Sequence, residues 1–264
     1  MQKISINKIP MKTIMLVLLS LVLIFSLYMI ITFNKDKYDA KKVIETLIND
    51  HVKIEKTPDG KDKYIIDFDK LLKINPSVKG WIRYNKDKVN YPIVQASDNN
   101  YYLSHDFNKS DNQVGTIFMD HRNQSFDDKN VVLFGHNGPG DLMFGSLKDL
   151  LGNEYFGNAD SDIIEIINVG NTSLYYEVFA VYNTYKEEYY ISTDFNSDDD
   201  FLIFINTLKA RSLIKFDVDL SKDDKILTLS TCVGYGDTEE RLVVHARLWK
   251  TSEETNENEN ENQD

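Results

Sequence analysis

The chain has 264 residues, a formal net charge of −12 and one cysteine. Its acidic balance argues against nucleic-acid binding, which needs basic patches on the protein, and against electrostatic adhesion to anionic lipid. A lone cysteine forms no internal disulfide, so Cys232 is either a buried small hydrophobe or a reactive thiol.

After a short flank, residues 1–12, comes an apolar run without a charge, residues 13–33. As a helix this run would reach about 31 Å, enough to cross the ~30 Å hydrocarbon core of a bilayer. A cleaved signal peptide is the alternative, but its apolar region is usually shorter, ~7–15 residues, and ends at a small-residue site. No such site precedes residues 34–37. We therefore expect an uncleaved transmembrane anchor, which the lysines on both its sides leave without a clear orientation.

The part after the anchor is long enough for one domain with a full core. Residues 38–56 carry apolar side chains at helical spacing and predict an amphipathic helix that breaks at residues 58–60. A second short helix is expected over residues 67–74. We assign residues 34–74 to a helical N-terminal extension.

Eight β-prone runs follow at short intervals, with Asn, Asp and Gly between them. They predict a mainly β domain over residues 75–251, either a closed barrel or a sandwich, with a short helix at residues 145–151. Residues 252–264 carry six acidic residues and no apolar one, which predicts a disordered tail. The eight runs are residues 80–84, 89–95, 115–120, 130–135, 162–168, 174–185, 225–231 and 241–250.

A longer helix is expected between the sixth and seventh strands, from about Ser197 to Leu213. Residues 196–200 offer an N-cap and an acidic first turn, and basic residues follow at the other end, as the helix dipole favours. Calcium binding by the three aspartates is the alternative, but a calcium loop spaces its ligands along a turn. The apolar face expected to dock on the barrel is Phe201, Phe204, Ile205 and Leu208.

Cys232 stands at the end of the seventh strand, and residues 234–237 after it read as a loop. Arg241 begins the next strand. Two strands joined by a short loop pair most easily as a hairpin, which would put Arg241 beside Cys232. A thiol is a good nucleophile only as thiolate, so a cation or an acid–base partner must lie nearby.

His136 is the expected partner of the thiol. It follows an apolar strand and precedes a loop, residues 137–140, so it too lies at a strand end. His245 is the rival, because it shares a strand face with Arg241. Two strand steps of ~6.8 Å separate His245 from Arg241, so we expect it away from the thiol. The remaining histidines lie on the first helix or in polar loops: His51, His105 and His121.

Together these residues resemble the signature of the sortases, the cysteine transpeptidases that attach proteins to the Gram-positive cell wall. The run Thr-Leu-Ser-Thr-Cys at residues 228–232, with Arg241 after it, and Leu-Phe-Gly-His-Asn at residues 133–137 carry the resemblance. Residues 75–82 and 99–103 resemble the class B branch. The likeness implies an eight-stranded sortase-type β-barrel, N-terminal helices, a helix between the sixth and seventh strands, and a preceding transmembrane helix.

The resemblance also implies a reaction that needs no cofactor. Cys232 would attack the carbonyl of a threonine in the C-terminal sorting signal of a secreted protein. Arg241 would hold the oxyanion, and His136 would protonate the leaving amine. An amine from a peptidoglycan cross-bridge or its lipid-linked precursor would then resolve the thioester. The protein would sit in the cell membrane with its N-terminus inside and its catalytic domain outside.

Five further positions are candidate substrate contacts. Asn99, Leu103 and Ser230 match segments that line the class B groove, so the resemblance implies a role for them there. Tyr190 and Ile191 lie in a connection of ~40 residues, far beyond ordinary loop lengths, and such insertions are usually functional. We expect these two to form one wall of a groove near the thiol.

Two other functions stay open at this point. A membrane-tethered cysteine peptidase that uses water as acceptor would need the same nucleophile, base and oxyanion donor. A non-catalytic surface-binding domain would instead bury Cys232 as a core residue. Comparing the products formed with and without an added amine distinguishes the peptidase from the transpeptidase. Thiol labelling at neutral pH distinguishes the binding domain, whose buried Cys232 would not react.

Overall fold

A computed structural model describes residues 10–57, 60–84, 86–151, 163–186, 189–232 and 239–252, with Cys232 described by its backbone. The first nine residues, the loop expected after Cys232 and the predicted acidic tail beyond Ser252 lie outside the described residues.

The N-terminal helix α1 (Met11–His51) is one continuous element. The expectation of two separate helices was wrong, because residues 34–37 contain no Pro or Gly and continue the helix. The i,i+4 ion pair Lys35–Asp39 crosses the end of this junction, and a second pair, Lys41–Glu45, follows it. Ala40, Ile44 and Leu47 are buried against the domain and end the exposed stretch.

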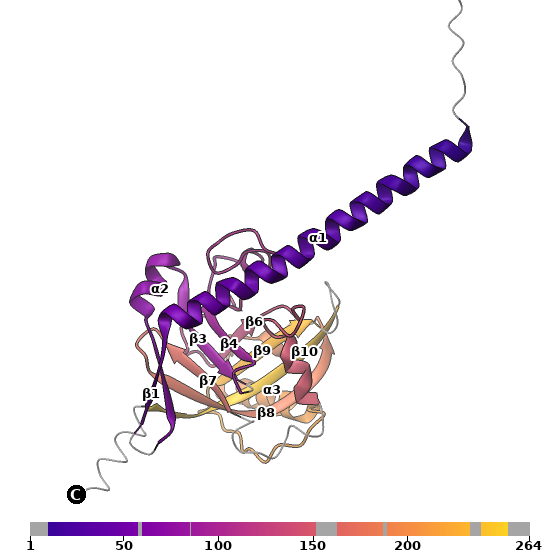
Figure 1. The fold of residues 1–264 in the computed structure, drawn as a ribbon. Helices are drawn as coiled ribbons and strands as arrows, with labels where there is room; N and C mark the ends of the chain where they lie inside the picture. Colours follow the sequence, from indigo (N-terminus) through magenta and orange to yellow (C-terminus); the bar gives the residue numbers. More distant parts are fainter. Residues whose placement is uncertain are drawn as a thin grey trace, which may run out of the picture.

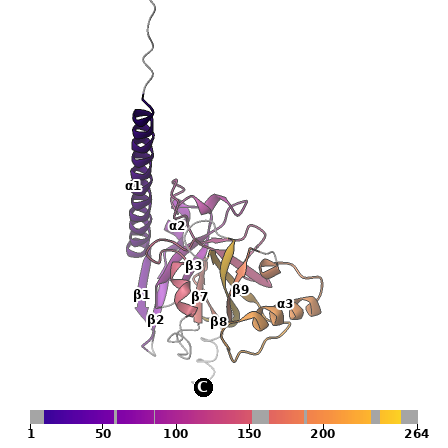
Figure 2. The same ribbon diagram turned by 90° about the vertical axis from the view of Figure 1, so that its right-hand side faces the viewer.

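The apolar half of α1 projects beyond the rest of the domain (Figures 1 and 2) and leaves its Leu, Ile, Val and Phe side chains exposed. Within the described ranges it is the one helix long and apolar enough to cross a membrane, a criterion that a signal sequence near the N-terminus also meets. The apolar half of α1 is therefore the segment that we expect to lie in a membrane.

The predicted helix over residues 38–56 is wrong after His51. β1 (Val52–Lys56) pairs antiparallel with β2 (Asp62–Ile66) as a separate hairpin. Alternation of apolar and polar residues in β1 suits a strand as well as a helix end, and pairing with β2 decides between them. α2 (Phe68–Ile74) follows as predicted, and Asp67 Oδ1 caps it by accepting from Lys70 N at 3.1 Å.

Eight strands close into a barrel in the order β10-β8-β7-β3-β4-β5-β6-β9. The predicted barrel is therefore confirmed, and every predicted run contains a strand. Two neighbouring pairs, β4–β5 and β6–β9, are parallel, and the others are antiparallel. The strands are β3 (Val78–Tyr84), β4 (Val89–Val94), β5 (Phe118–Met119), β6 (Asn130–Phe134), β7 (Ile163–Asn168), β8 (Ser173–Tyr185), β9 (Ile226–Cys232) and β10 (Glu240–Thr251).

Three short 3₁₀ helices lie in the connections of the part of the chain that the structure describes. The predicted helix at residues 145–151 is one of them, Gly145–Leu151. The second, Tyr101–Leu103, lies between β4 and β5, and the third, Tyr189–Ile191, lies between β8 and the next helix. The last two positions matter for the site, because four of the five candidate substrate contacts lie in or next to these two turns.

The helix expected between the sixth and seventh barrel strands is α3 (Asp198–Arg211). Ser197 Oγ accepts from Asp200 N at 3.1 Å, which confirms the predicted N-cap. Its predicted apolar face is confirmed too, because Phe201, Ile205 and Leu208 are buried and Phe204 is half-buried. Figure 2 shows α3 and α1 on opposite sides of the barrel.

Candidate active site

The candidate nucleophile and base leave the barrel at the same edge. β6 and β9 run parallel as neighbours, with Phe134 paired to Ser230 at the last register position. Gly135 N donates to Ser230 O at 3.3 Å and extends the contact by one residue. His136 and Cys232 each follow that last pair by two residues. Parallel pairing therefore carries both chain segments to one barrel edge.

Arg241 comes to this edge from the other side of β9. In the antiparallel pairing of β9 with β10, Arg241 is the register partner of Cys232. The hairpin predicted from the sequence is confirmed. The Cys232 backbone thus lies between β10, with Arg241 opposite it, and the chain segment that carries His136. Arg241 is partly buried, and its Nη1 donates to Glu240 O at 3.0 Å.

His136 is partly buried and is held by a backbone group. Its Nε2 lies 2.8 Å from the carbonyl oxygen of Leu103. A carbonyl oxygen only accepts, so Nε2 is the donor in this contact and Nδ1 is the other ring nitrogen. Leu103 is 37% exposed. Its backbone carbonyl holds the imidazole, a contact that is separate from the place in the substrate groove that the resemblance implies for Leu103.

The rival His245 is a core residue. Its side chain is fully buried, and its two ring nitrogens lie 2.9 Å from Thr228 Oγ1 and 3.1 Å from Tyr182 Oη. Burial lowers the pKa of His245 to about 3. In the β9–β10 register its partner is Thr228, four residues before Cys232. The expectation that it lies away from the thiol is confirmed.

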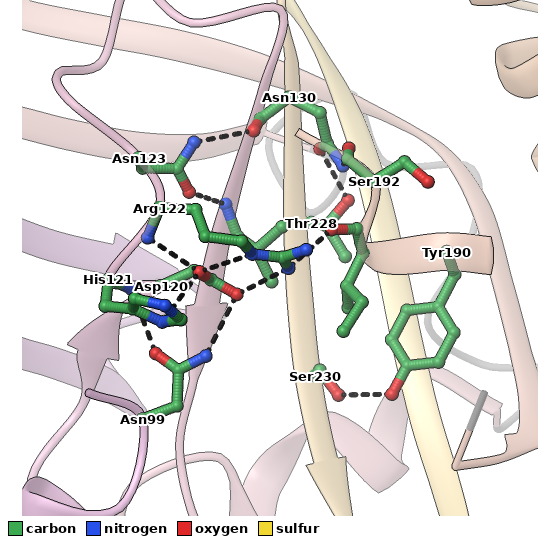
Figure 3. A network of polar contacts seen from close by, with 12 residues as sticks. Asn99, Asp120, His121, Arg122, Asn123, Asn130, Tyr190, Ser192, Thr228 and Ser230 are labelled. Carbon is green, nitrogen blue, oxygen red and sulfur yellow. Dashed lines mark hydrogen bonds and ion pairs between the residues drawn. The ribbon is translucent and has the colours of Figure 1, made fainter. Parts of the chain in front are cut away.

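Asn99, Tyr190 and Ser230 lie in the region that Figure 3 shows, where Asn99 contacts Asp120 and Tyr190 contacts Ser230. Tyr190 is buried, and its hydroxyl lies 3.2 Å from Ser230 Oγ, two residues before Cys232. The Ile191 carbonyl accepts from Arg122, and Arg122 and Asn99 both donate to the carboxylate of Asp120. The segment of residues 189–191 therefore lies against the part of β9 that leads to Cys232.

Asp120 and Arg122 were not predicted from the sequence as site residues. Asp120 is fully buried and accepts from Arg122 Nε and Nη2 at 2.9 and 2.8 Å and from Asn99 Nδ2 at 3.1 Å. Burial alone raises the pKa of Asp120, but the bonds and charge of Arg122 outweigh it and hold the pKa below its ordinary value. Arg122 Nη2 also donates to Ile191 O at 2.8 Å. The sequence signal, an Asp-x-Arg after a short apolar run, is common in exposed loops.

Comparison with known proteins agrees with this geometry. The model of the sortase domain matches residues 83–249. Sortase B of Staphylococcus aureus is 38% identical over 188 residues, which cover 70% of this chain and 75% of that protein. Sortase B of Listeria monocytogenes is 36% identical over 180 residues, 67% of this chain and 72% of that one.

The chain belongs to the sortase family. Solved structures support the same class: sortase B from Bacillus anthracis in complex with AAEK1 covers 82% of this sortase and 99% of its own chain, with a TM-score of 0.70 and 36% identity. The Staphylococcus aureus sortase B–substrate complex covers 82% and 97%, with a TM-score of 0.67 and 32% identity. This sortase is thus a class B cysteine transpeptidase, and the alternative of a non-catalytic binding domain loses its support.

Proposed function

We propose that this sortase is anchored in the cell membrane, cleaves a sorting motif after Thr through a thioester on Cys232, and transfers the acyl group to a cell-wall amine. The observation that carries the proposal is the register of β9. Cys232 has Arg241 opposite it in β10, and it shares its barrel edge with His136, which follows the parallel neighbour β6. A nucleophile, a fixed cation and a proton carrier at one edge are the groups that acyl transfer needs.

In the first half of the reaction, the Cys232 thiolate forms a C–S bond with the threonine carbonyl carbon. The carbonyl oxygen becomes an oxyanion, which the guanidinium of Arg241 stabilises with its planar set of donors. Collapse of this intermediate breaks the C–N bond. His136, as imidazolium, gives its proton to the leaving amine.

In the second half, an amine attacks the thioester while His136 takes its proton. The new C–N bond forms, and the C–S bond breaks to return the Cys232 thiolate. With Nε2 held on the Leu103 carbonyl, Nδ1 is the nitrogen that would exchange this proton. The contact thus fixes both the ring orientation and the working nitrogen.

The apolar half of α1 supports the anchor, because its exposed side chains need a nonpolar surrounding. The orientation with the catalytic domain outside follows from the proposed substrates. Protease treatment of intact cells tests it: the domain should be released while a tag before residue 11 stays protected. Protection of the domain would contradict the orientation.

The reaction is tested with the full chain in detergent. We would incubate it with Thr-containing sorting peptides and candidate amines and search by mass spectrometry for a thioester on Cys232. We expect the thioester in the intact protein and none in Cys232→Ala. Modification of another residue, or none with any peptide, would contradict the proposed mechanism.

Hydrolysis is the competing outcome of the same thioester, because water can take the place of the amine. Product analysis decides between them. A transpeptidase yields amine-linked peptide in preference to free acid once an amine is added. Free acid alone at every amine concentration would favour the peptidase.

A further inference from the structure

The connector of residues 189–192, between β8 and α3, is bonded at four successive residues to side chains of the barrel strands and of the β5–β6 connection. Tyr189 Oη lies 3.2 Å from Tyr182 Oη. Tyr190 Oη lies 3.2 Å from Ser230 Oγ, and the Ile191 carbonyl accepts from Arg122. The Ser192 carbonyl accepts from Asn130 Nδ2 at 2.9 Å, a bond drawn in Figure 3.

The first and last of these attachments are joined through the barrel. Thr228 Oγ1 donates to Asn130 Oδ1 at 2.8 Å, and His245 bridges Thr228 to Tyr182. Four side chains from β6, β9, β10 and β8 therefore form one circuit that starts at Tyr189 and ends at Ser192. All four are at most 2% exposed: Asn130, Thr228, His245 and Tyr182.

The proton positions in this circuit follow from its partners. Asn130 must present its amide NH₂ to the Ser192 carbonyl, so its oxygen accepts the hydroxyl proton of Thr228. Thr228 has no second proton, so His245 donates to it from Nδ1. The other ring nitrogen, Nε2, then accepts from the Tyr182 hydroxyl. The Tyr182 oxygen then accepts from Tyr189, whose hydroxyl also lies 3.3 Å from Thr184 Oγ1 as a second acceptor.

The circuit is electrically neutral and tolerates no change of protonation. Burial lowers the pKa of His245 to about 3 and raises the pKa of Tyr182, so neither group carries charge near neutral pH. Loss of one member removes one of the two hydrogen bonds of its neighbour and leaves a buried donor or acceptor of that neighbour unsatisfied, which is more costly than loss of the bond itself. The connector position is therefore tied to the packing of four barrel strands.

We propose that His245 and Tyr182 are positioning residues for substrate recognition: through this circuit they hold the connector, with Tyr190 and Ile191, as a preformed wall of the peptide groove. The inference rests on the proposed function, because it takes the groove to be the site of the sorting peptide. A preformed wall lowers the ordering that peptide binding would otherwise require. Its loss should raise KM more than it lowers kcat.

A pair of matched tyrosines in β8 tests this positioning. Tyr182→Phe removes one hydroxyl from the circuit and keeps the ring. Tyr176→Phe is the control, because Tyr176 is also fully buried and its hydroxyl has no hydrogen-bond partner within the described part of the chain. We expect Tyr182→Phe to raise KM for the sorting peptide about three- to tenfold, the equivalent of one net hydrogen bond. Tyr176→Phe should match the unmodified chain, and alkylation of Cys232 by a small thiol reagent should be equal in all three.

Two substitutions of the histidine sharpen the test. His245→Asn keeps a donor near Thr228 and loses the acceptor for Tyr182, whereas His245→Gln does the reverse. Both should raise KM with kcat nearly unchanged. If Tyr182→Phe and both histidine variants keep the KM of the unmodified chain, the circuit does not position the groove and the proposal is overturned.

Hydrogen exchange of the full chain in detergent needs no substrate and separates this inference from the proposed function. Amides of residues 189–192 should exchange about three- to tenfold faster in Tyr182→Phe than in Tyr176→Phe, while β9 stays protected. Equal exchange in the two variants overturns the positioning. An unmodified chain that forms no thioester with any peptide overturns the proposed function instead, and the exchange rates still decide whether the circuit holds the connector.

Discussion

The two histidines near β9, His136 and His245, differ in burial, and this difference decides which of them can exchange a proton with a substrate. His136 lies at the edge, partly exposed, with one ring nitrogen on a backbone carbonyl. His245 lies a few residues back along the barrel, fully buried, with both nitrogens bound and its pKa lowered to about 3. A residue that exchanges protons with substrate needs a nitrogen that substrate can reach. The edge residue offers one, and the core residue can only hold other side chains in place.

Removal of the Cys232 thiol is the strongest test of the chemistry proposed for the barrel edge. Cys232→Ala should abolish thioester formation and transfer, because no other cysteine exists in the chain. Loss of one sulfur atom should change the free energy of unfolding by about 1 kcal/mol or less. Mass spectrometry and urea denaturation measure the two effects. Residual transfer above the uncatalysed rate would remove Cys232 from the mechanism.

Substituting each histidine in turn compares the two regions directly. His136→Ala should lower kcat about 10²- to 10⁴-fold, the usual contribution of an acid–base group. His245→Ala should retain most of the kcat at saturating peptide but unfold at a lower temperature, since it removes the donor to Thr228 Oγ1 and the acceptor of the Tyr182 hydroxyl proton. Steady-state kinetics and thermal melts check both. If His245→Ala loses kcat as severely as His136→Ala, the choice of base is wrong.

Arg241 extends the comparison along β10, which carries both Arg241 and His245. Arg241→Ala should lower kcat about 10²- to 10³-fold, as loss of an oxyanion donor does. Arg241→Lys should restore little, because an ammonium lacks the planar fork of the guanidinium. The rate of Cys232 acylation is the measurement. Full activity of Arg241→Lys would indicate that charge alone is needed.

The barrel could be predicted from the sequence because its strands are short apolar runs between turn residues. The helix boundary at His51 could not, because the alternating residues of β1 become a strand only when β2 pairs with them. The three edge residues were found through their motif and strand-end positions. The buried polar residues were missed, since Asp120, Asn130 and Thr228 look like ordinary loop and strand polar residues. Their burial depends on contacts between segments far apart in the sequence, such as Asn130 with Ser192 and Thr228 with His245.

The Asp120–Arg122 pair tests whether the edge depends on buried charge as well as on the neutral circuit. Arg122→Ala leaves the Asp120 carboxylate buried without its cation, and the free energy of unfolding should fall. We expect the lower end of the ~3–5 kcal/mol typical of such losses, because the Arg122 side chain is 38% exposed. Adding Asp120→Asn to Arg122→Ala should recover part of the loss. No recovery in the double variant, measured by urea denaturation, would mean that the loss is not one of uncompensated charge.

The last effect we expect is a pH dependence of the free energy of unfolding that belongs to His245 alone. Its folded pKa of about 3 lies below the ordinary value of 6.5. As pH falls below about 6.5, His245 therefore binds a proton in the unfolded chain but stays neutral in the folded chain. The stabilisation is complete above that pH and is lost progressively toward pH 3. His245→Gln removes this titration and keeps every other histidine and carboxylate, so the difference between the two proteins isolates it. From pH 7 to pH 5, urea denaturation should show the unmodified chain losing about 1–2 kcal/mol more than the variant. Equal losses would mean that the folded protein accommodates a charged His245, and the neutral circuit through Thr228 and Tyr182 would then be wrong.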